Sequence, residues 1–243
     1  MIFEEDWYCH IPIAHRGLYN DEIAENSLKA FENAANHNFP MELDVMLTSD
    51  GEVVVFHDIN SVRLTGASFQ IDEITFEQLS KLKLPDGQSI PKLVDVLDLI
   101  RGRVPLIIEP KVKNYNGKLE KKLFDILKDY SGQFAIQAFH PQTLFWFKRK
   151  MPDIPRGLLS GTFDGFAMPL WQKTILRNLF LIPLLKPHYV GLEYKCLKEI
   201  TPKLLHRFDS IPIVAWTINS IEQYQSISKD CSNIIFEDFI PTK

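Results

Sequence analysis

Charged and histidine side chains gather in four short stretches of the first half of the chain. In order these are His15-Arg16-Gly17, Glu42-Leu43-Asp44, His57-Asp58 and Glu109-Pro110-Lys111. Side chains two residues apart on a strand point to the same face. If these stretches lie on strands, Glu42 therefore shares a face with Asp44, and Glu109 shares one with Lys111. Buried carboxylates at that density repel one another unless a proton or a cation compensates their charge.

A hard divalent cation with oxygen ligands is the simplest compensation for Glu42, Asp44 and Glu109. The usual histidine and cysteine ligands of zinc are missing from this set, so we expect Mg²⁺ or Ca²⁺. The alternative is a structural network of ion pairs, in which Arg16 and Lys111 balance the carboxylates without a metal. Two cations would still leave one negative charge uncompensated.

The same stretches carry the groups that a phosphodiester requires. Arg16, Lys111 and a metal ion can neutralise the non-bridging oxygens of the phosphate. His15 and His57 can move protons to and from the attacking and leaving oxygens near neutral pH. An isolated histidine near a strand end is ordinarily structural, but the company of carboxylates and cations favours a catalytic interpretation. The pattern predicts a site that cleaves a phosphodiester.

The elements that must position these groups follow a β–α rhythm along the chain. Eight β-rich runs are bounded by turn residues, and most are followed by a stretch with helical spacing. They are Ile11–His15, Met41–Val45, Val104–Glu109, Phe134–Ala138, Arg156–Ser160, Tyr189–Glu193, Pro212–Trp216 and Asn233–Glu237. Eight such units in about 250 residues predict an α/β fold of the (β/α)8 TIM barrel type, with reactive groups at the carboxyl ends of the strands.

Helices are predicted between the strands. One connection between strands is much longer than a loop and a single helix would require. The helix candidates are Ser27–Asn38, Lys118–Asp129, Gln142–Lys150, Thr201–Phe208 and Ile221–Ser228. Between the second and third strands lies an insertion of approximately residues 47–103, which opens on the turn signal Ser49-Asp50-Gly51. The second strand should therefore fold back as a hairpin. We expect one decorated domain over residues 1–243.

Several motifs together resemble the glycerophosphodiester phosphodiesterase family. They are His15-Arg16-Gly17, Glu25-Asn26-Ser27, Glu42-Leu43-Asp44-Val45, Thr48-Ser49-Asp50-Gly51, His57-Asp58, Arg63-Leu64-Thr65-Gly66, Glu109-Pro110-Lys111 and Trp216-Thr217-x-Asn219. Each motif alone is weak, whereas their order and joint presence over essentially the whole chain are specific to that family.

The resemblance implies an activity and a role for each matching residue. It implies metal-dependent hydrolysis of glycerophosphodiesters to glycerol 3-phosphate and an alcohol. Metal ligands would be Glu42, Asp44 and Glu109, phosphate would bind Arg16 and Lys111, and the acid–base pair would be His15 and His57. By analogy, His15 acts as base and His57 as acid in the first step.

Other interpretations stay open on the sequence alone. Trp216, at the end of a strand, is expected either to contact the substrate or to plug the barrel. The enzyme could instead act on lysolipids or release a cyclic phosphate, and a barrel that binds a phosphorylated ligand without turnover is the non-enzymatic alternative. Completeness of the metal and histidine sets disfavours the last.

The apolar stretch 166–186 also has two interpretations. Met168, Trp171, Ile175, Leu179 and Ile182 have helical spacing, and Leu176, Phe180 and Leu184 widen the stripe. We favour an outer helix between the fifth and sixth strands that buries this stripe against the barrel. The alternative is a surface that forms a homodimer or contacts a membrane.

Composition excludes several classes of protein. The 243 residues are 45% hydrophobic and 24% charged, which is typical of a globular domain. A net charge of -4 gives no general attraction to nucleic acid, so a small molecule is the expected partner. Cys9, Cys196 and Cys231 are widely spaced, which indicates reduced thiols. The acidic start and the lack of a transmembrane segment make a cytoplasmic location the expectation.

Overall fold

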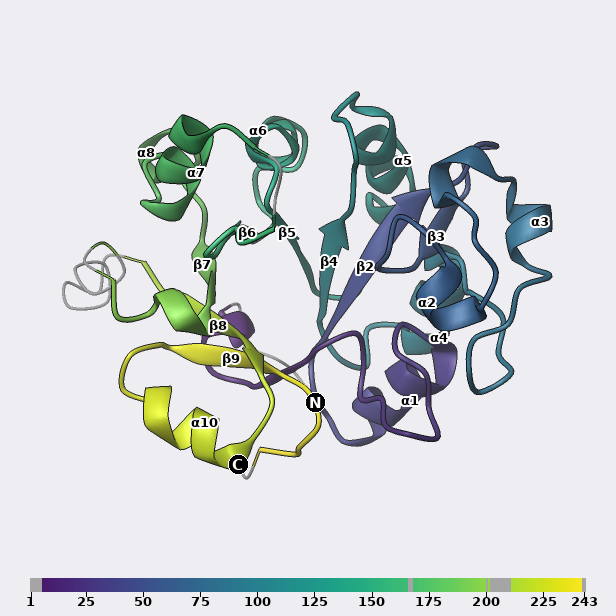
Figure 1. Ribbon diagram of the computed structural model, residues 1–243, viewed down its shortest axis with the longest axis horizontal. Helices are drawn as coiled ribbons and strands as arrows, with labels where there is room; N and C mark the ends of the chain where they lie inside the picture. The colour runs from purple at the N-terminus through teal and green to yellow at the C-terminus, as the bar shows by residue number, and fades with distance from the viewer. Residues whose placement is uncertain (1–5, 166–167, 200, 202–210, 242–243) are drawn as a thin grey trace. The chain divides into compact units, whose positions relative to one another are not determined.

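A computed structural model describes residues 6–165, 168–199, 201 and 211–241. Contacts within the chain divide it into two compact units. Unit 1 contains Ala14–Phe134, and unit 2 contains residues 6–13 with the described residues from Ala135 onward. Figure 1 shows unit 1 in purple to teal, and most of unit 2 in green and yellow.

The strands of unit 1 form a small, mostly parallel sheet. Ala14, the residue of strand β1 (Ile13–Ala14) that belongs to unit 1, pairs with Met41 of β2 (Met41–Leu47), and β2 pairs in parallel with β4 (Leu106–Pro110). The register places Asp44 directly opposite Glu109. Every residue of β4 is buried, and so is every residue of β2 except the last. This is the pattern of parallel strands that are covered on both faces.

Three helices cover the sheet of unit 1. Helix α1 (Leu28–Asn36) packs on α4 (Leu93–Ile100), and α5 (Lys118–Leu127) follows β4 in the chain (Figure 1). The hydroxyl of Ser27 accepts a hydrogen bond from the Ala30 backbone N–H and so caps α1 at its start. Residues Ala30, Phe31 and Ala34 bury one face of that helix.

The predicted hairpin and insertion are confirmed. Strand β3 (Val53–Val55) runs antiparallel to β2 and returns through the turn at Gly51. The insertion continues as α2 (Val62–Thr65), a 3-10 helix η2 (Ile71–Glu73) and α3 (Phe76–Leu79). It packs a small hydrophobic core of its own against the hairpin. That core contains Ala24, Met46, Val54, Phe56, Ile71, Ile74, Leu79, Leu84 and Ile90.

Unit 2 carries the remaining parallel strands. Their order is β5 (Phe134–Ala138), β6 (Arg156–Ser160), β7 (Tyr189–Glu193), β8 (Ile213–Ile218) and β9 (Asn233–Phe236). Helix α6 (Pro141–Lys150) follows β5, η3 (Tyr194–Cys196) follows β7, and α10 (Ile221–Ile227) follows β8. The 3-10 helix η1 (Trp7–Cys9) also belongs to this unit, because the Asn233 amide donates to the Tyr8 carbonyl at 2.9 Å.

The prediction of one buried outer helix over the stretch 166–186 is wrong. The described part forms two short helices, α7 (Leu170–Arg177) and α8 (Ile182–Leu185), and the backbone between them is left-handed at Leu179. Because the helix is interrupted, the side chains of the predicted stripe do not all lie on one helical face. Leu179 is buried, whereas Trp171, Phe180 and Leu184 are exposed. The helix predicted over Thr201–Phe208 lies, apart from its first residue, outside the described residues.

The fold class is the predicted (β/α)8 barrel. Among the described residues, all nine strands except β3 run parallel, and helices alternate with them along the chain. The insertion follows the second parallel strand, as the interrupted rhythm predicts. None of the described helices combines the length and the hydropathy needed to cross a bilayer.

Gly17 permits a close approach between the loop after β1 and helix α1. Its φ is +82°, and a Cβ atom at this position would lie 2.9 Å from the Ala30 backbone carbon. Gly66, at the end of α2, has a similar φ of +71°, but no atom lies within 4 Å of the equivalent Cβ position. The two glycines therefore separate the effect of backbone conformation from that of crowding.

We expect Gly17→Ala to lower the free energy of unfolding by about 2–4 kcal/mol, because it adds a clash to the strain of a positive φ. Gly66→Ala should cost only about 1 kcal/mol, the conformational part alone. Urea titrations monitored by circular dichroism measure both. Equal losses in the two variants would show that the contact with Ala30 is unimportant.

Candidate active site

The three carboxylates predicted to bind metal lie together in unit 1. Glu42 and Asp44 project from the same face of β2, and Glu109 lies on β4 opposite Asp44. All three are buried, and one oxygen from each lies within 4.8 Å of the others. Strand alternation and register are therefore enough to bring the acidic set together.

Two cations contact this cluster. The Lys111 ammonium lies 3.2 Å from Asp44 Oδ1 and also contacts the Glu109 carboxylate. The Arg16 guanidinium lies 3.3 Å from Asp44 Oδ2. Burial opposes ionisation of Asp44, but these cations hold the pKa of its carboxyl well below the ordinary value. Asp44 is therefore ionised.

Glu42 is the member of the cluster that its neighbours do not satisfy. Its Oε2 accepts a hydrogen bond from the Arg16 backbone N–H at 3.1 Å, while its buried Oε1 has no hydrogen-bond partner among the described residues. Burial, followed by the charges of Asp44 and Glu109, raises the pKa of Glu42 well above its ordinary value. The ion pairs with Lys111 and Arg16 thus leave one carboxylate under-compensated.

The donor set fits a hard divalent cation. All three candidate ligands offer carboxylate oxygens, which Mg²⁺ and Ca²⁺ prefer. A cation beside Glu42 Oε1 would give that oxygen the partner it lacks and would favour the ionised form of the carboxyl group. The acidic cluster can therefore hold a metal ion.

Both predicted histidines lie near this cluster. His15 follows β1, and its Nε2 lies 4.0 Å from Glu42 Oε2. His57 follows β3, and its Nδ1 lies 2.7 Å from Asp58 Oδ1. When Nδ1 donates to Asp58, Nε2 is the nitrogen that can accept or release a proton. Burial lowers the pKa of His57, so its ring is mostly neutral at pH 7.

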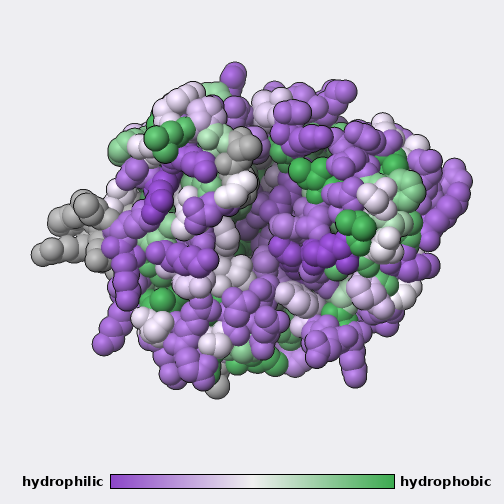
Figure 2. Space-filling view, in the orientation of Figure 1, coloured by the Kyte–Doolittle hydropathy of each residue, from purple (hydrophilic) through white to green (hydrophobic). Residues whose placement is uncertain are grey.

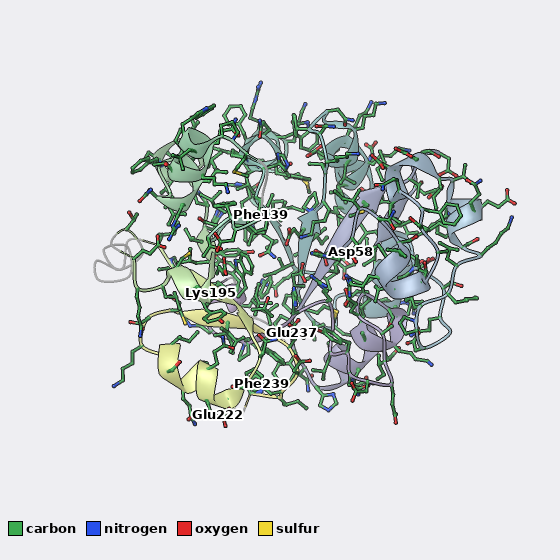
Figure 3. All side chains as sticks on the ribbon, viewed as in Figure 1. Asp58, Phe139, Lys195, Glu222, Glu237 and Phe239 are labelled. Carbon is green, nitrogen blue, oxygen red and sulfur yellow. The ribbon has the colours of Figure 1, made fainter. Side chains whose placement is uncertain are left out.

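The structure adds residues to which the sequence analysis assigned no role. Arg63, on α2, donates from Nε to Asp58 Oδ2 and from both terminal nitrogens to the Glu25 carboxylate at 2.7 Å. Arg16 donates to the same Glu25 at 2.7 Å. A continuous chain of charged contacts therefore joins the ring of His57 to the guanidinium of Arg16. Figure 3 labels Asp58 beside the strands of unit 1.

Ionisation supports the same chain of contacts. Burial opposes the charge on Glu25 and Asp58, but hydrogen bonds from Arg63 lower the pKa of both carboxyl groups. Asn26 adds a further contact, because its amide donates to Asp44 Oδ2 at 2.9 Å. The motifs containing these residues were visible in the sequence, but nothing in their spacing predicted that Arg63 would reach both carboxylates.

Trp216 is the one predicted site residue that lies in unit 2. It is on β8, and its ring packs edge to face on Phe139, with 5.6 Å between ring centroids. Phe139 follows β5 directly and is labelled in Figure 3. Contact between Trp216 and a substrate stays a prediction. All the other predicted site residues lie in the cluster of unit 1.

Fold and site together define a class of protein, a (β/α)8-barrel hydrolase of phosphoric diesters. The carboxylates on β2 and β4 can hold a cation, and two histidines and two basic residues lie beside them. The chain belongs to the glycerophosphoryl diester phosphodiesterase family, whose family model matches residues 15–224.

Individual relatives agree with this assignment. A glycerophosphodiester phosphodiesterase of Bacillus altitudinis is 28% identical, with 93% of each chain covered. A lysophospholipase D of Mus musculus is also 28% identical, over 95% of this chain and 83% of the mouse protein. Among solved structures, an Oleispira antarctica phosphodiesterase in complex with the product sn-glycerol-3-phosphate has a TM-score of 0.78. It is 21% identical, and the match covers 94% of this chain and 93% of that one.

We expect Arg63→Ala to reduce kcat/KM for glycerophosphocholine by about 10- to 100-fold, because small displacements of catalytic groups are costly. Arg63→Lys should restore only part of the loss, since an ammonium cannot bridge two carboxylates as a planar guanidinium does. Steady-state hydrolysis assays measure both effects.

Arg103→Ala is the matched control for this variant. The Arg103 side chain is 41% exposed, against 45% for Arg63, and it pairs with Glu32 rather than with the cluster. It should leave kcat/KM unchanged. If Arg63→Ala keeps full activity, the chain of contacts has no role in orienting His57 or Arg16.

Proposed function

We propose that this chain hydrolyses soluble glycerophosphodiesters to glycerol 3-phosphate and an alcohol, with one divalent cation held by Glu42, Asp44 and Glu109. The reaction class follows from the family, and the product bound to the Oleispira antarctica relative supports the substrate class. The observation that carries the metal assignment is the buried Glu42 Oε1, which lacks a hydrogen-bond partner among the described residues.

Arg16 and Lys111 are proposed to bind the phosphate group of the substrate. Both cations lie against Asp44, and their side chains keep 15% and 20% of their surface exposed. Burial opposes the charge on Lys111, but Glu109 and Asp44 raise the pKa of its ammonium, so it stays charged. When bound, the metal would supply Lewis-acid neutralisation of a phosphate oxygen.

The histidines are proposed to move the protons, with His15 as base and His57 as acid in the first step. His15 takes the proton of the glycerol hydroxyl whose oxygen attacks phosphorus. His57 gives a proton from Nε2 to the oxygen of the departing alcohol as its bond to phosphorus breaks. Water then opens the cyclic phosphate with the roles exchanged. Asp58 stabilises the charged ring of His57 through Nδ1.

Lysophospholipids are the second candidate substrates, because the mouse relative is a lysophospholipase D. A panel of glycerophosphocholine, glycerophosphoethanolamine, glycerophosphoglycerol and lysophosphatidylcholine separates the two classes. A ³¹P spectrum of the products distinguishes a monoester from a five-membered cyclic phosphate. Turnover of the lysolipid alone would replace the proposed substrate class.

Glu42→Gln should weaken the binding of Mg²⁺ or Ca²⁺ at least about tenfold, because it removes a ligand charge. Calorimetric titration of the protein measures the affinity directly. Glu32→Gln changes a partly exposed carboxylate on α1 that pairs with Arg103, and it should leave the affinity unchanged. Because Glu42 has a raised pKa, its proton should leave when the cation binds, and affinity should fall as pH falls.

Metal removal tests the same site through the reaction. Excess EDTA should abolish hydrolysis, and Asp44→Asn should lower activity and regain part of it at high metal concentration. Full activity after metal removal, verified by elemental analysis, would leave the ion-pair network as the role of these carboxylates.

His57→Ala should lose general acid catalysis, worth on the order of 10²–10⁴ in rate, on glycerophosphocholine. It should retain far more activity on a p-nitrophenyl ester of glycerol phosphate, whose leaving group needs no proton. His15→Ala should be impaired on both substrates. Equal losses for His57→Ala on the two substrates would mean that the roles are reversed.

The same role predicts a pH dependence. Since a general acid must be protonated and burial lowers the His57 pKa, the rate on glycerophosphocholine should fall as pH rises through that lowered pKa.

A further inference from the structure

Unit 2 exposes a concentrated set of large hydrophobic side chains on α7 and α8. Leu170 keeps 79% of its surface exposed, Phe180 63%, Trp171 62% and Leu184 58%. Among the described residues, no other large hydrophobic side chain is as exposed as these four. Figure 2 shows hydrophobic side chains over α7 and α8, at the upper left of the view.

These helices are anchored to the unit. Leu179 and Leu185 are buried beneath them, and the Ser160 hydroxyl donates to the Leu176 carbonyl at 2.9 Å. Lys148, in the last turn of α6, donates to the Leu184 carbonyl at 2.7 Å and so joins α6 to α8. Large hydrophobic side chains that are exposed close together on one segment are typical of a surface that contacts another molecule.

Basic residues lie on α6 and α7 and directly after α8, close along the chain to the exposed hydrophobic side chains. The last turn of α6 carries Lys148, Arg149 and Lys150, and residues 168–192 contain Lys173, Arg177 and Lys186 with no aspartate or glutamate. Arg177 is neutralised by Glu199, whereas Lys173 and Lys186 form no ion pair with a described residue. Along the chain, the acidic residues that flank these segments are Asp153, Asp164 and Glu193. Among the described residues, these segments therefore carry more basic than acidic side chains, although the whole chain has a net charge of -4.

We propose that this surface, formed by α6, α7 and α8, docks on a membrane containing anionic lipid. A tryptophan with leucine and phenylalanine beside lysine and arginine is the composition of protein segments that insert shallowly between lipid headgroups. Anionic lipid headgroups complement the basic side chains of this surface, and the acyl region of the bilayer accepts Leu170 and Phe180. A second copy of this chain fits less well, because a two-fold contact would set the same cations against each other.

Co-sedimentation with vesicles tests the proposal on the whole protein. It should bind vesicles of phosphatidylcholine with 30% phosphatidylglycerol, and bind pure phosphatidylcholine vesicles much more weakly. Added salt should reduce binding, as expected for headgroup charges. Trp171 is the most exposed of the four tryptophans, because Trp7 is buried and Trp146 and Trp216 are partly buried, so its ring should account for most of any fluorescence shift to shorter wavelength on binding.

Substitutions separate the hydrophobic and electrostatic parts. The double change Leu170→Ser with Phe180→Ser should lower the bound fraction and reduce the blue shift of Trp171. Lys173→Gln with Lys186→Gln should weaken binding by about 25-fold, roughly fivefold for each charge removed. Hydrolysis of soluble glycerophosphocholine should be unchanged in all of them, so docking and the proposed reaction are tested independently.

Matched controls lie in unit 1. Phe69→Ser with Val94→Ser removes large hydrophobic side chains that are 43% and 41% exposed, and Lys121→Gln with Lys122→Gln removes two exposed charges on α5. Neither control should affect vesicle binding. The proposal is overturned if anionic vesicles do not bind the folded protein at low salt, or if these controls weaken binding equally. A dimer in sedimentation velocity that Phe180→Ser dissociates would also overturn it and assign the surface to a second copy.

Discussion

Burial of three carboxylates on neighbouring strands is the constraint around which unit 1 is organised. Glu42, Asp44 and Glu109 are placed by strand alternation and by a parallel register, and removing them from water would be prohibitive without compensation. Lys111 and Arg16 compensate part of this negative charge, and both lie against Asp44. The negative charge of Glu42 is the part that these two cations do not compensate. A divalent cation bound at the cluster would compensate it.

The insertion, approximately residues 47–103, brings Arg63 to the site together with His57 and Asp58. Its small hydrophobic core holds helix α2 on the hairpin, and α2 carries Arg63. From there the guanidinium bridges Asp58, which orients His57, and Glu25, which orients Arg16. Arg63 therefore helps to position both the histidine proposed to transfer a proton and the arginine proposed to bind phosphate. A guanidinium suits this position because it presents several N–H donors in a fixed plane.

Average properties of the chain conceal a strong local asymmetry in unit 2. The small net charge argues against general attraction to polyanions, yet the helices α6 to α8 combine basic residues with the most exposed hydrophobic side chains described. Hydrophobic and electrostatic attraction to a lipid surface act together only when both kinds of group share a face. The acidic remainder of the chain would be repelled by an anionic bilayer, which favours one orientation of docking.

The sequence alone determined the strand segments, the β2–β3 hairpin, the interrupted rhythm at the insertion and the metal-compatible carboxylates. These features depend on local periodicity, on turn residues and on spacing within a strand, all of which are set by residues close together in the sequence. Tertiary structure decided that Arg63 reaches Glu25, which lies 38 residues earlier, and that one oxygen of Glu42 lacks a hydrogen-bond partner among the described residues. It also decided that Trp171 and Phe180 are exposed while Leu179 is buried, because the stretch forms two short helices with a left-handed residue at Leu179 instead of one continuous helix. Contacts across folded elements depend on packing directions that spacing along the chain does not encode.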